Sequence, residues 1–316
     1  ETDTSPIIIN SKIDKIQKFY PSYSFGERTR SFLKVQDGCD YTCSFCTIPL
    51  ARGNSRSGSI IDTVEMAEQI AKKNIKEIVL TGVNIGDFGK PYGENFIDLL
   101  YKLDKIRGIE RYRISSIEPN LLTDEIIDFV KSSSKFLPHF HIPLQSGSNK
   151  ILKYMRRRYT TNIFQERVAK IKSTIPESCI GVDVIVGFPK EDETQFHKTF
   201  QFLENLNISY LHVFSYSARN NTDALNIYPK VESSEIINRS KILHILSRNK
   251  KKEFLEKNIN KLRNVLIENF EDGIISGFSS NYVMVKTEGN SNEINSIIPL
   301  KLSRIDGESM IGCRIN

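Results

Sequence analysis

Blocks of strand-like and helix-like patterning alternate along the first two-thirds of the chain. Short runs rich in β-branched and aromatic residues lie at 31–36, 77–81, 112–116, 136–144, 180–186 and 210–216. Between them, apolar residues recur at helical spacing over 62–73, 95–106, 123–132, 161–174 and 193–206. Asp62 and Glu65 are expected to cap the first helix. Six strand–helix units predict an α/β fold with a parallel sheet, either an open doubly wound sheet or a full or partial barrel.

The pattern changes after a long charged helical stretch at 233–257. From residue 261, apolar residues alternate with polar ones over 263–268, 282–286 and 297–302, and turn-forming clusters occur at 271–273, 288–290 and 306–308. This spacing is typical of a small antiparallel barrel of about five strands. We therefore predict a linker over 1–30, one domain over 31–258 and a second over 259–316.

Composition narrows the class of protein. The chain has 316 residues, five cysteines and a net charge of +6, with basic groups at 153–158 and 248–252. This charge permits a polyanionic partner without requiring one. Three clustered cysteines do not make a disulfide framework, so we expect a reducing compartment, the cytoplasm. No apolar run approaches the roughly 18 residues of a membrane helix. Because residue 1 is Glu, we expect an N-terminal portion to be missing.

Three of the cysteines form the most informative motif. Cys39, Cys43 and Cys46 lie within eight residues at C-x3-C-x2-C spacing, directly after the first predicted strand. Thiolates suit iron–sulfur clusters, and three of them leave one iron of a 4Fe-4S cluster open to bind a small molecule. Zinc is the alternative, but it needs a fourth ligand, and the first histidine of the chain is His139.

Polar residues also follow the other predicted strands. The carboxyl ends of parallel strands meet at one edge, where function gathers. There the chain places Thr81, Gly82, Asn84, Ser115, Ser116, Glu118, His139, His141, Gln145, Ser146, Asp183, Gly187 and residues 215–219. Each is weak alone, and His139 and His141 can equally be internal hydrogen-bonding residues.

Longer motifs bring a resemblance to a known family. The segments GCDYTCSFCTIPLARG, LTGVNIGDFG, RISSIEP, HFHIPLQSGSNKILKYMRRRYT and DVIVGFPKEDETQF resemble the radical S-adenosylmethionine (SAM) methylthiotransferases that modify tRNA. The resemblance implies a partial (βα)6 barrel followed by a small RNA-binding β-barrel called TRAM. RISSIEP and HIPLQSGS are most similar to the branch that adds a methylthio group to carbon 2 of N6-threonylcarbamoyladenosine at tRNA position 37.

The resemblance also implies roles for individual residues. Cys39, Cys43 and Cys46 would hold the cluster and act in catalysis, with SAM on the open iron. Residues implied to contact SAM or substrate are Phe45, Thr81, Gly82, Asn84, Glu118, Gln145, Arg157 and Asp183. Candidates for RNA contact are Arg156, Arg157, Arg158, Lys286 and Lys301.

The family also implies a second cluster and an electron-donor protein. Its members carry a second 4Fe-4S cluster on three further cysteines in an N-terminal domain, and a reduced flavodoxin or ferredoxin-type protein supplies electrons. Cys179 and Cys313 cannot replace those cysteines, so the chain should bind SAM without completing methylthiolation. We expect a monomer that recognises the tRNA anticodon loop. Alternatives are action on isopentenyladenosine tRNA or a ribosomal protein, and a non-catalytic, metal-stabilised RNA-binding module.

Overall fold

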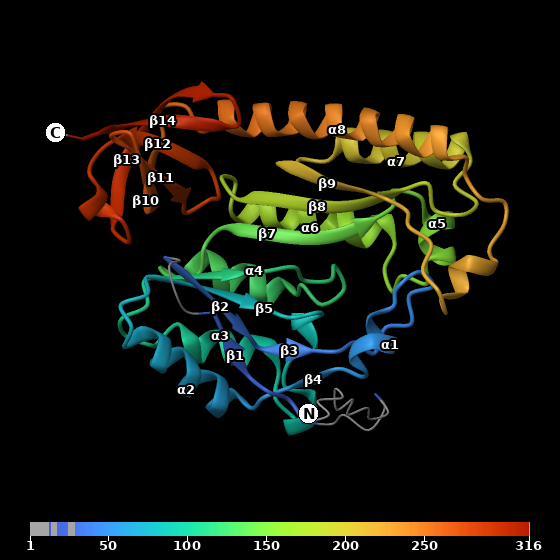
Figure 1. Ribbon diagram of the computed structural model, residues 1–316, viewed down its shortest axis with the longest axis horizontal. Helices are drawn as coiled ribbons and strands as arrows, with labels where there is room; N and C mark the ends of the chain where they lie inside the picture. Colours follow the sequence, from blue (N-terminus) through green and yellow to red (C-terminus); the bar gives the residue numbers. More distant parts are fainter. Residues whose placement is uncertain (1–12, 14–17, 25–28, 316) are drawn as a thin grey trace, which may run out of the picture.

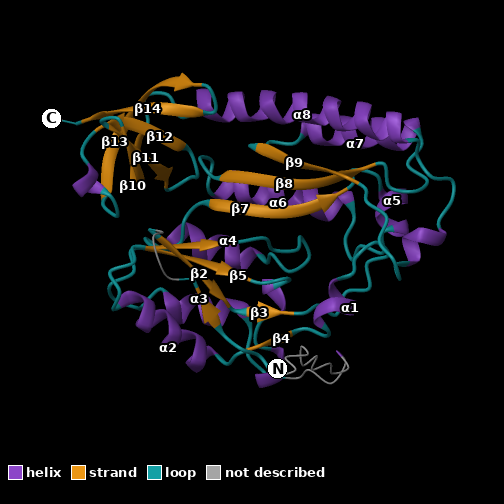
Figure 2. Ribbon diagram, in the orientation of Figure 1, coloured by secondary structure: helices purple, strands orange, loops and turns teal. Residues whose placement is uncertain are grey.

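Parallel strands with helices outside them form the larger part of the molecule (Figures 1 and 2). The computed structural model describes residues 13, 18–24 and 29–315. Its parallel strands are β2 (Arg30–Lys34), β5 (Glu77–Thr81), β6 (Arg111–Ile114), β7 (His139–Gln145), β8 (Cys179–Val186) and β9 (Tyr210–Ser215). The long helices are α2 (Ile60–Ala71), α3 (Phe96–Leu103), α4 (Asp124–Ser132), α6 (Thr161–Thr174), α7 (Glu193–Asn205) and α8 (Ser233–Glu256). The predicted α/β class is confirmed.

Two sheets share these strands. β2, β5 and β6 pair in parallel in one sheet, and β7, β8 and β9 in the other. Isolated parallel bridges from Tyr112 to Phe136 and from Ser116 to His141 connect the two sheets between β6 and β7. Among the described residues β2 and β9 do not pair, so the six-strand arrangement stays open. Because these pairings and both bridges are parallel, the carboxyl ends of all six strands point the same way.

Side chains alternate between two faces of these strands. On β8, Ile180, Val182, Val184 and Val186 are buried in the main apolar core together with residues of the outer helices. Asp183 lies between them in sequence and is only partly buried. The helix side of the sheet is thus apolar, and the inner side carries polar groups.

Several short elements were not predicted. They are α1 (Ile48–Arg52), α5 (Asn149–Tyr154), β3 (Gln36–Asp37), β4 (Arg56–Ser57) and the 3-10 helices η2 (Ile85–Asp87), η3 (Lys90–Tyr92), η4 (Asp223–Asn226) and η5 (Ser291–Glu293). The predicted cap of α2 is wrong. Ser59 is the N-cap, and Asp62 is its capping-box partner.

The predicted linker over 1–30 lies mostly outside the described residues. Within it, β1 (Ser22–Tyr23) pairs antiparallel with β2 and extends the first sheet, so this part is structured. No helix in the described part of the chain is long and apolar enough to cross a membrane.

The C-terminal strands close on themselves. β10 (Leu262–Glu271), β11 (Ile274–Ser279), β12 (Met284–Glu288), β13 (Ile297–Asp306) and β14 (Ser309–Arg314) form a barrel in the order β10-β11-β12-β14-β13. β13 pairs back to β10, which completes the ring. β12 and β14 pair in parallel, so the predicted barrel is antiparallel at its other pairings only. The pattern missed β11 and β14, whose apolar alternation is interrupted by Gly277 and Gly312.

The small barrel sits at the end where the large strands begin (Figure 1). Arg111, the first residue of β6, donates to the carbonyl oxygens of Asn264 at 2.7 Å and Phe278 at 3.2 Å. His139, the first residue of β7, stacks on Tyr282 with ring centroids 4.1 Å apart. These contacts close one end of the space enclosed by the six strands, here called the inner space. The cysteine loop lies at its opposite end, where the strands end.

We expect Arg111→Ala to lower the free energy of unfolding by about 2–4 kcal/mol, since two carbonyl oxygens of the small barrel and the buried Glu77 carboxylate 3.8 Å away lose a partner. Urea denaturation followed by circular dichroism measures this. Arg107→Ala removes an exposed arginine and should shift stability by less than about 0.5 kcal/mol. Equal stability of the two variants would contradict the role of Arg111 in joining β6 to the small barrel.

Candidate active site

The cysteine loop is held at both ends by Asp37. Its carboxylate accepts from Arg52 and Arg56, each at 3.1 Å, and from the Gly38 amide at 2.9 Å. Gly38 has φ of +68°, and a Cβ there would lie 2.0 Å from the carbonyl oxygen of Asn54. Only glycine fits this position. Gly38 therefore restricts the backbone conformation of the loop between β3 and α1.

Each cysteine sulfur of the loop accepts a hydrogen bond. The donors are the Tyr41 amide to Cys39 at 3.4 Å, the Arg157 guanidinium to Cys43 at 3.2 Å and the Ile48 amide to Cys46 at 3.5 Å. Such donors set the potential of a cluster. Burial raises the pKa of Cys39 to about 11 and also raises that of Cys43. Because metal ligands are thiolates, loading a cluster must release these protons.

Arg157 connects Cys43 to a buried carboxylate. Its side chain is 5% exposed and makes a two-oxygen ion pair with Glu118, the shorter contact being to Oε2 and the other 2.6 Å. Its Nε donates to the Tyr159 hydroxyl at 3.1 Å. Arg157 was expected to contact SAM or substrate, and its partner in the structure is a carboxylate of the protein itself. The guanidinium is buried, and the RNA contact of Arg157 stays a prediction.

Sequence reasoning missed Gln36, which joins the loop to the end of β5. This side chain is fully buried. Its oxygen accepts from the amides of Val83 at 3.0 Å and Asn84 at 2.7 Å, and its nitrogen donates to the Gly38 carbonyl at 2.8 Å. Gly82 must lack a side chain, since a Cβ would lie 2.9 Å from the Gln36 carbonyl oxygen. A polar residue closing an apolar strand run was the available signal.

The segment Thr81 to Asn84 presents one unused polar atom. Asn84 is buried and donates to Asp87 at 2.8 Å, but its side-chain oxygen has no partner among the described residues. A buried acceptor without a donor fits an ammonium group of a ligand. Thr81 instead donates to the Leu33 carbonyl at 3.3 Å, which is a structural contact.

Phe45 and Gln145 lie beside the loop. Phe45 is half-buried, meets Phe188 edge to face at 6.2 Å and forms an aromatic wall. Gln145 ends β7 with φ of +66°, at a register shift after Pro143. A left-handed glutamine is strained, and strain of this kind concentrates at functional sites.

The two histidines of β7 differ. His139 is buried, contacts the Tyr210 hydroxyl at 3.1 Å, and burial lowers its pKa well below the ordinary value, so it is an internal residue. His141 is partly exposed on the inner side, with Nε2 2.7 Å from an oxygen of Asp183. The predicted residues thus fall into a cysteine-loop group and a mid-strand group at His141 and Asp183.

The other cysteines lie away from the loop. Cys179 begins β8 and is buried beside Phe254 and Leu255, and Cys313 is exposed on β14. Both belong to the end of the molecule that carries the small barrel, so neither supplies a fourth thiol to the loop. The donor set is three thiols, which fits a 4Fe-4S cluster with an open iron better than a closed zinc site.

Comparison with known families agrees with this donor set. Residues 33–203 match the Radical SAM superfamily. The chain belongs to the radical SAM superfamily. Membership implies a 4Fe-4S cluster and SAM. Cys39, Cys43 and Cys46 are the residues present that would hold the cluster.

Most of this chain aligns with relatives that are named as tRNA-modifying enzymes. It is 39% identical to the threonylcarbamoyladenosine tRNA methylthiotransferase MtaB of Bacillus subtilis, over 88% of this chain and 63% of that protein. It is 42% identical to MtaB of Aquifex aeolicus, over 87% and 66%. The tRNA-2-methylthio-N(6)-dimethylallyladenosine synthase of Acetivibrio thermocellus is 31% identical over 90% and 60%. The chain therefore spans less than two-thirds of the length of these relatives.

Solved structures share the fold at low identity. The radical SAM methyltransferase TsrM of Kitasatospora setae superposes with a TM-score of 0.52 at 13% identity, over 78% of this chain and 41% of that one. Coproporphyrinogen III oxidase HemN of Escherichia coli gives 0.51 at 12% identity, over 79% and 66%. These similarities show a mixed α/β radical SAM fold and nothing of the substrate.

Cys43→Ala should abolish the cluster, because one of three thiolates and the partner of Arg157 are lost together. Anaerobic reconstitution with iron and sulfide, followed by visible absorption and iron analysis, measures this. Cys313→Ala removes an exposed thiol and should leave the spectrum unchanged. A parental spectrum for Cys43→Ala would refute its assignment as a ligand.

Proposed function

We propose that this chain is the radical SAM and RNA-binding part of a methylthiotransferase acting on carbon 2 of N6-threonylcarbamoyladenosine at tRNA position 37. The observation that carries the proposal is the three-thiol loop with the unused acceptor of Asn84 beside it. The relatives named for this substrate support it, since two of them share 39% and 42% identity with the chain. The dimethylallyladenosine relative shares 31%, which places isopentenyladenosine second.

The roles of individual residues follow from their contacts. When bound, the cluster supplies the electron that cleaves SAM reductively and so permits hydrogen abstraction from the substrate. Asn84 would accept from the SAM ammonium group, and Phe45 would pack beside its adenine. Arg157 positions Cys43 while neutralising Glu118. Gln145 and Asp183 face the inner space that would take the adenosine or the substrate base.

The described residues outside the cysteine loop offer no cluster of thiols for holding the transferred sulfur. Beyond the loop, Cys179 is buried and Cys313 lies on the small barrel. We therefore place the sulfur source in a second 4Fe-4S cluster carried outside these 316 residues. A flavodoxin or ferredoxin-type electron donor, a monomeric state and a cytoplasmic location belong to the same proposal.

The proposed division is a partial (βα)6 radical SAM domain over 31–258 and a TRAM-like RNA-binding domain over 259–316. The change from parallel to mainly antiparallel pairing between β9 and β10 supports this boundary. α8 ends at Glu256, and β10 begins at Leu262.

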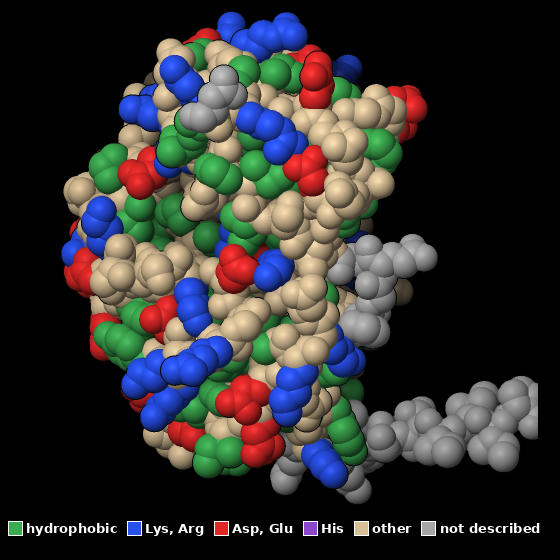
Figure 3. All heavy atoms as spheres, turned by 90° about the vertical axis from the view of Figure 1, so that its left-hand side faces the viewer, with side chains coloured by type: hydrophobic (Ala, Val, Ile, Leu, Met, Phe, Trp, Pro, Cys, Tyr) green, Lys and Arg blue, Asp and Glu red, His purple; other side chains and the backbone are tan. Residues whose placement is uncertain are grey.

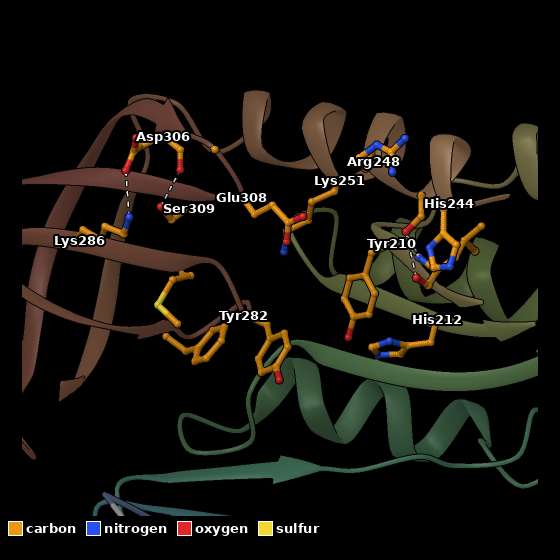
Figure 4. A pocket seen from close by; sticks show the side chains of 15 residues that line it. Tyr210, His212, His244, Arg248, Lys251, Tyr282, Lys286, Asp306, Glu308 and Ser309 are labelled. Carbon is orange, nitrogen blue, oxygen red and sulfur yellow. Dashed lines mark hydrogen bonds and ion pairs between the residues drawn. The ribbon is translucent and has the colours of Figure 1, made fainter. Parts of the chain in front are cut away.

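A cleft between α8 and the small barrel supports RNA binding (Figure 4). It measures about 830 Å³, and its walls carry Arg248, Lys251 and Lys286. Its aromatic side is a stacked pair, Phe278 and Tyr282, with centroids 4.5 Å apart. Basic grooves with aromatic platforms bind single-stranded nucleic acid. Figure 3, which faces the small barrel's side, shows basic and acidic side chains interspersed over this face.

The predicted RNA contacts lie on several surfaces. Lys286 lines the cleft and pairs with Asp306 at 3.0 Å, and Lys301 is exposed on β13. Arg156 pairs with Asp223, and Arg158 donates to the Asp40 carbonyl beside the cysteine loop at 2.9 Å. Arg156 and Arg158 are thus placed for a substrate approaching the loop, and Lys286 for a more distant part of the same RNA.

Replacing both Arg248 and Lys251 with Glu should weaken binding of an anticodon stem-loop RNA and lower the salt slope by about 2, because two phosphate contacts are lost. Fluorescence anisotropy over a salt series measures both quantities. Glu at Lys102 and Lys105 makes the same charge change on an exposed surface around α3. Equal losses in the two double variants would assign the effect to net charge and contradict a specific cleft.

The substrate assignment is tested in cells that lack the full-length gene. Mass spectrometry of tRNA nucleosides should show threonylcarbamoyladenosine without its methylthio group, restored by the intact gene and not by the gene carrying Cys43→Ala. Loss of methylthio groups from isopentenyladenosine alone would support the second branch. Retention of every methylthio group on tRNA would overturn the proposed reaction.

A further inference from the structure

Three side chains, one each from β7, β8 and β9, converge on the inner face of these strands. A nitrogen of His141, an oxygen of Asp183 and a nitrogen of His212 all lie within 4.8 Å of one another. From this geometry we propose a second metal site, at which His141, Asp183 and His212 bind a divalent transition-metal ion.

The strand register explains the convergence. Asp183 pairs directly with His212 across β8 and β9, and Pro143 of β7 pairs with Asp183 on its other side. His141 precedes Pro143 by two residues, so it projects from the same face. The site is therefore built on three rigid, adjacent strands, which is what a precise coordination geometry requires.

The donor chemistry favours a transition metal. Two imidazoles and one carboxylate form the ligand set that binds divalent iron, zinc and related ions with positions left open. The 2.7 Å between His141 Nε2 and the Asp183 oxygen is a hydrogen bond, so a bound ion would take the place of this contact. Thiols are absent from the set, which separates it chemically from the cysteine loop.

His212 is the residue that a simple hydrogen bond does not explain. The contact between His141 and Asp183 satisfies two groups, but the His212 ring lies 5.2 Å from the His141 ring, centroid to centroid. His212 is exposed and lines the cleft between α8 and the small barrel, and its ring meets the edge of Tyr210 at 5.1 Å (Figure 4). The open positions of a bound ion would thus be reached from the cleft.

Cobalt and zinc titrations test the site in the full chain with Cys39, Cys43 and Cys46 replaced by Ala, so that loop thiols cannot compete. We expect one equivalent of Co²⁺ to bind with the visible bands of nitrogen and oxygen ligation, and Zn²⁺ to displace it. In the same background, His212→Ala and Asp183→Asn should each weaken Co²⁺ binding at least about 100-fold, as loss of a direct ligand must exceed the 10–100-fold cost of a second-shell change.

The matched control is His244→Ala, which removes another histidine of the same cleft and should leave binding unchanged. Thermal unfolding without metal checks that each variant is folded, and only the ligand variants should lose the stabilisation that added Zn²⁺ gives. Three outcomes would each overturn the site. They are the absence of saturable binding, unchanged binding by folded His212→Ala, and a thiolate-to-cobalt band that places the ion on Cys179 or Cys313.

Discussion

The hydrogen bonds of one buried side chain, Gln36, hold the reactive end of this molecule together. The amide of Gln36 binds the backbone of the β5 end through its oxygen and the backbone of the cysteine loop through its nitrogen. A glutamine is one of the few side chains that can do both at once, since it carries an acceptor and two donors. The three thiols and the unused acceptor of Asn84 keep their relative positions because both segments are fixed to this one group.

The opposite end of the inner space depends on buried charge. Glu77, Arg111 and Arg113 lie at the start of β5 and β6, all less than 5% exposed, and the small barrel covers them. Arg113 stacks over Tyr282 at 4.8 Å, so the barrel supplies aromatic contact as well as carbonyl acceptors. Removing the small barrel would expose this charged cluster and take away the two carbonyl acceptors of Arg111 and the ring that covers Arg113, which is costly. The small barrel therefore also stabilises the larger part of the chain.

Much of this architecture follows from pattern alone. Runs of β-branched residues separated by helical spacing predicted the six parallel strands, and the cysteine spacing predicted the loop. Short elements such as α1 and β3 escaped because a few residues carry no periodicity. The cap of α2 was misassigned because Ser59 and Asp62 are both good capping residues, and only the backbone path decides between them. Gln36 and His212 were missed because their partners lie 47 and 29 residues away along the chain.

The chemical type of the interior side chains changes from one end of the molecule to the other. The three thiols of the cysteine loop lie at the carboxyl ends of the strands, nitrogen and oxygen groups of His141, Asp183 and His212 lie midway, and aromatic and basic groups lie at the other end. Parallel strands produce such a gradient because their carboxyl ends all lie at one end of the fold and their amino ends at the other. A thiol at the far end, such as Cys179, is therefore shielded from the chemistry of the loop by the fold itself and needs no special protection.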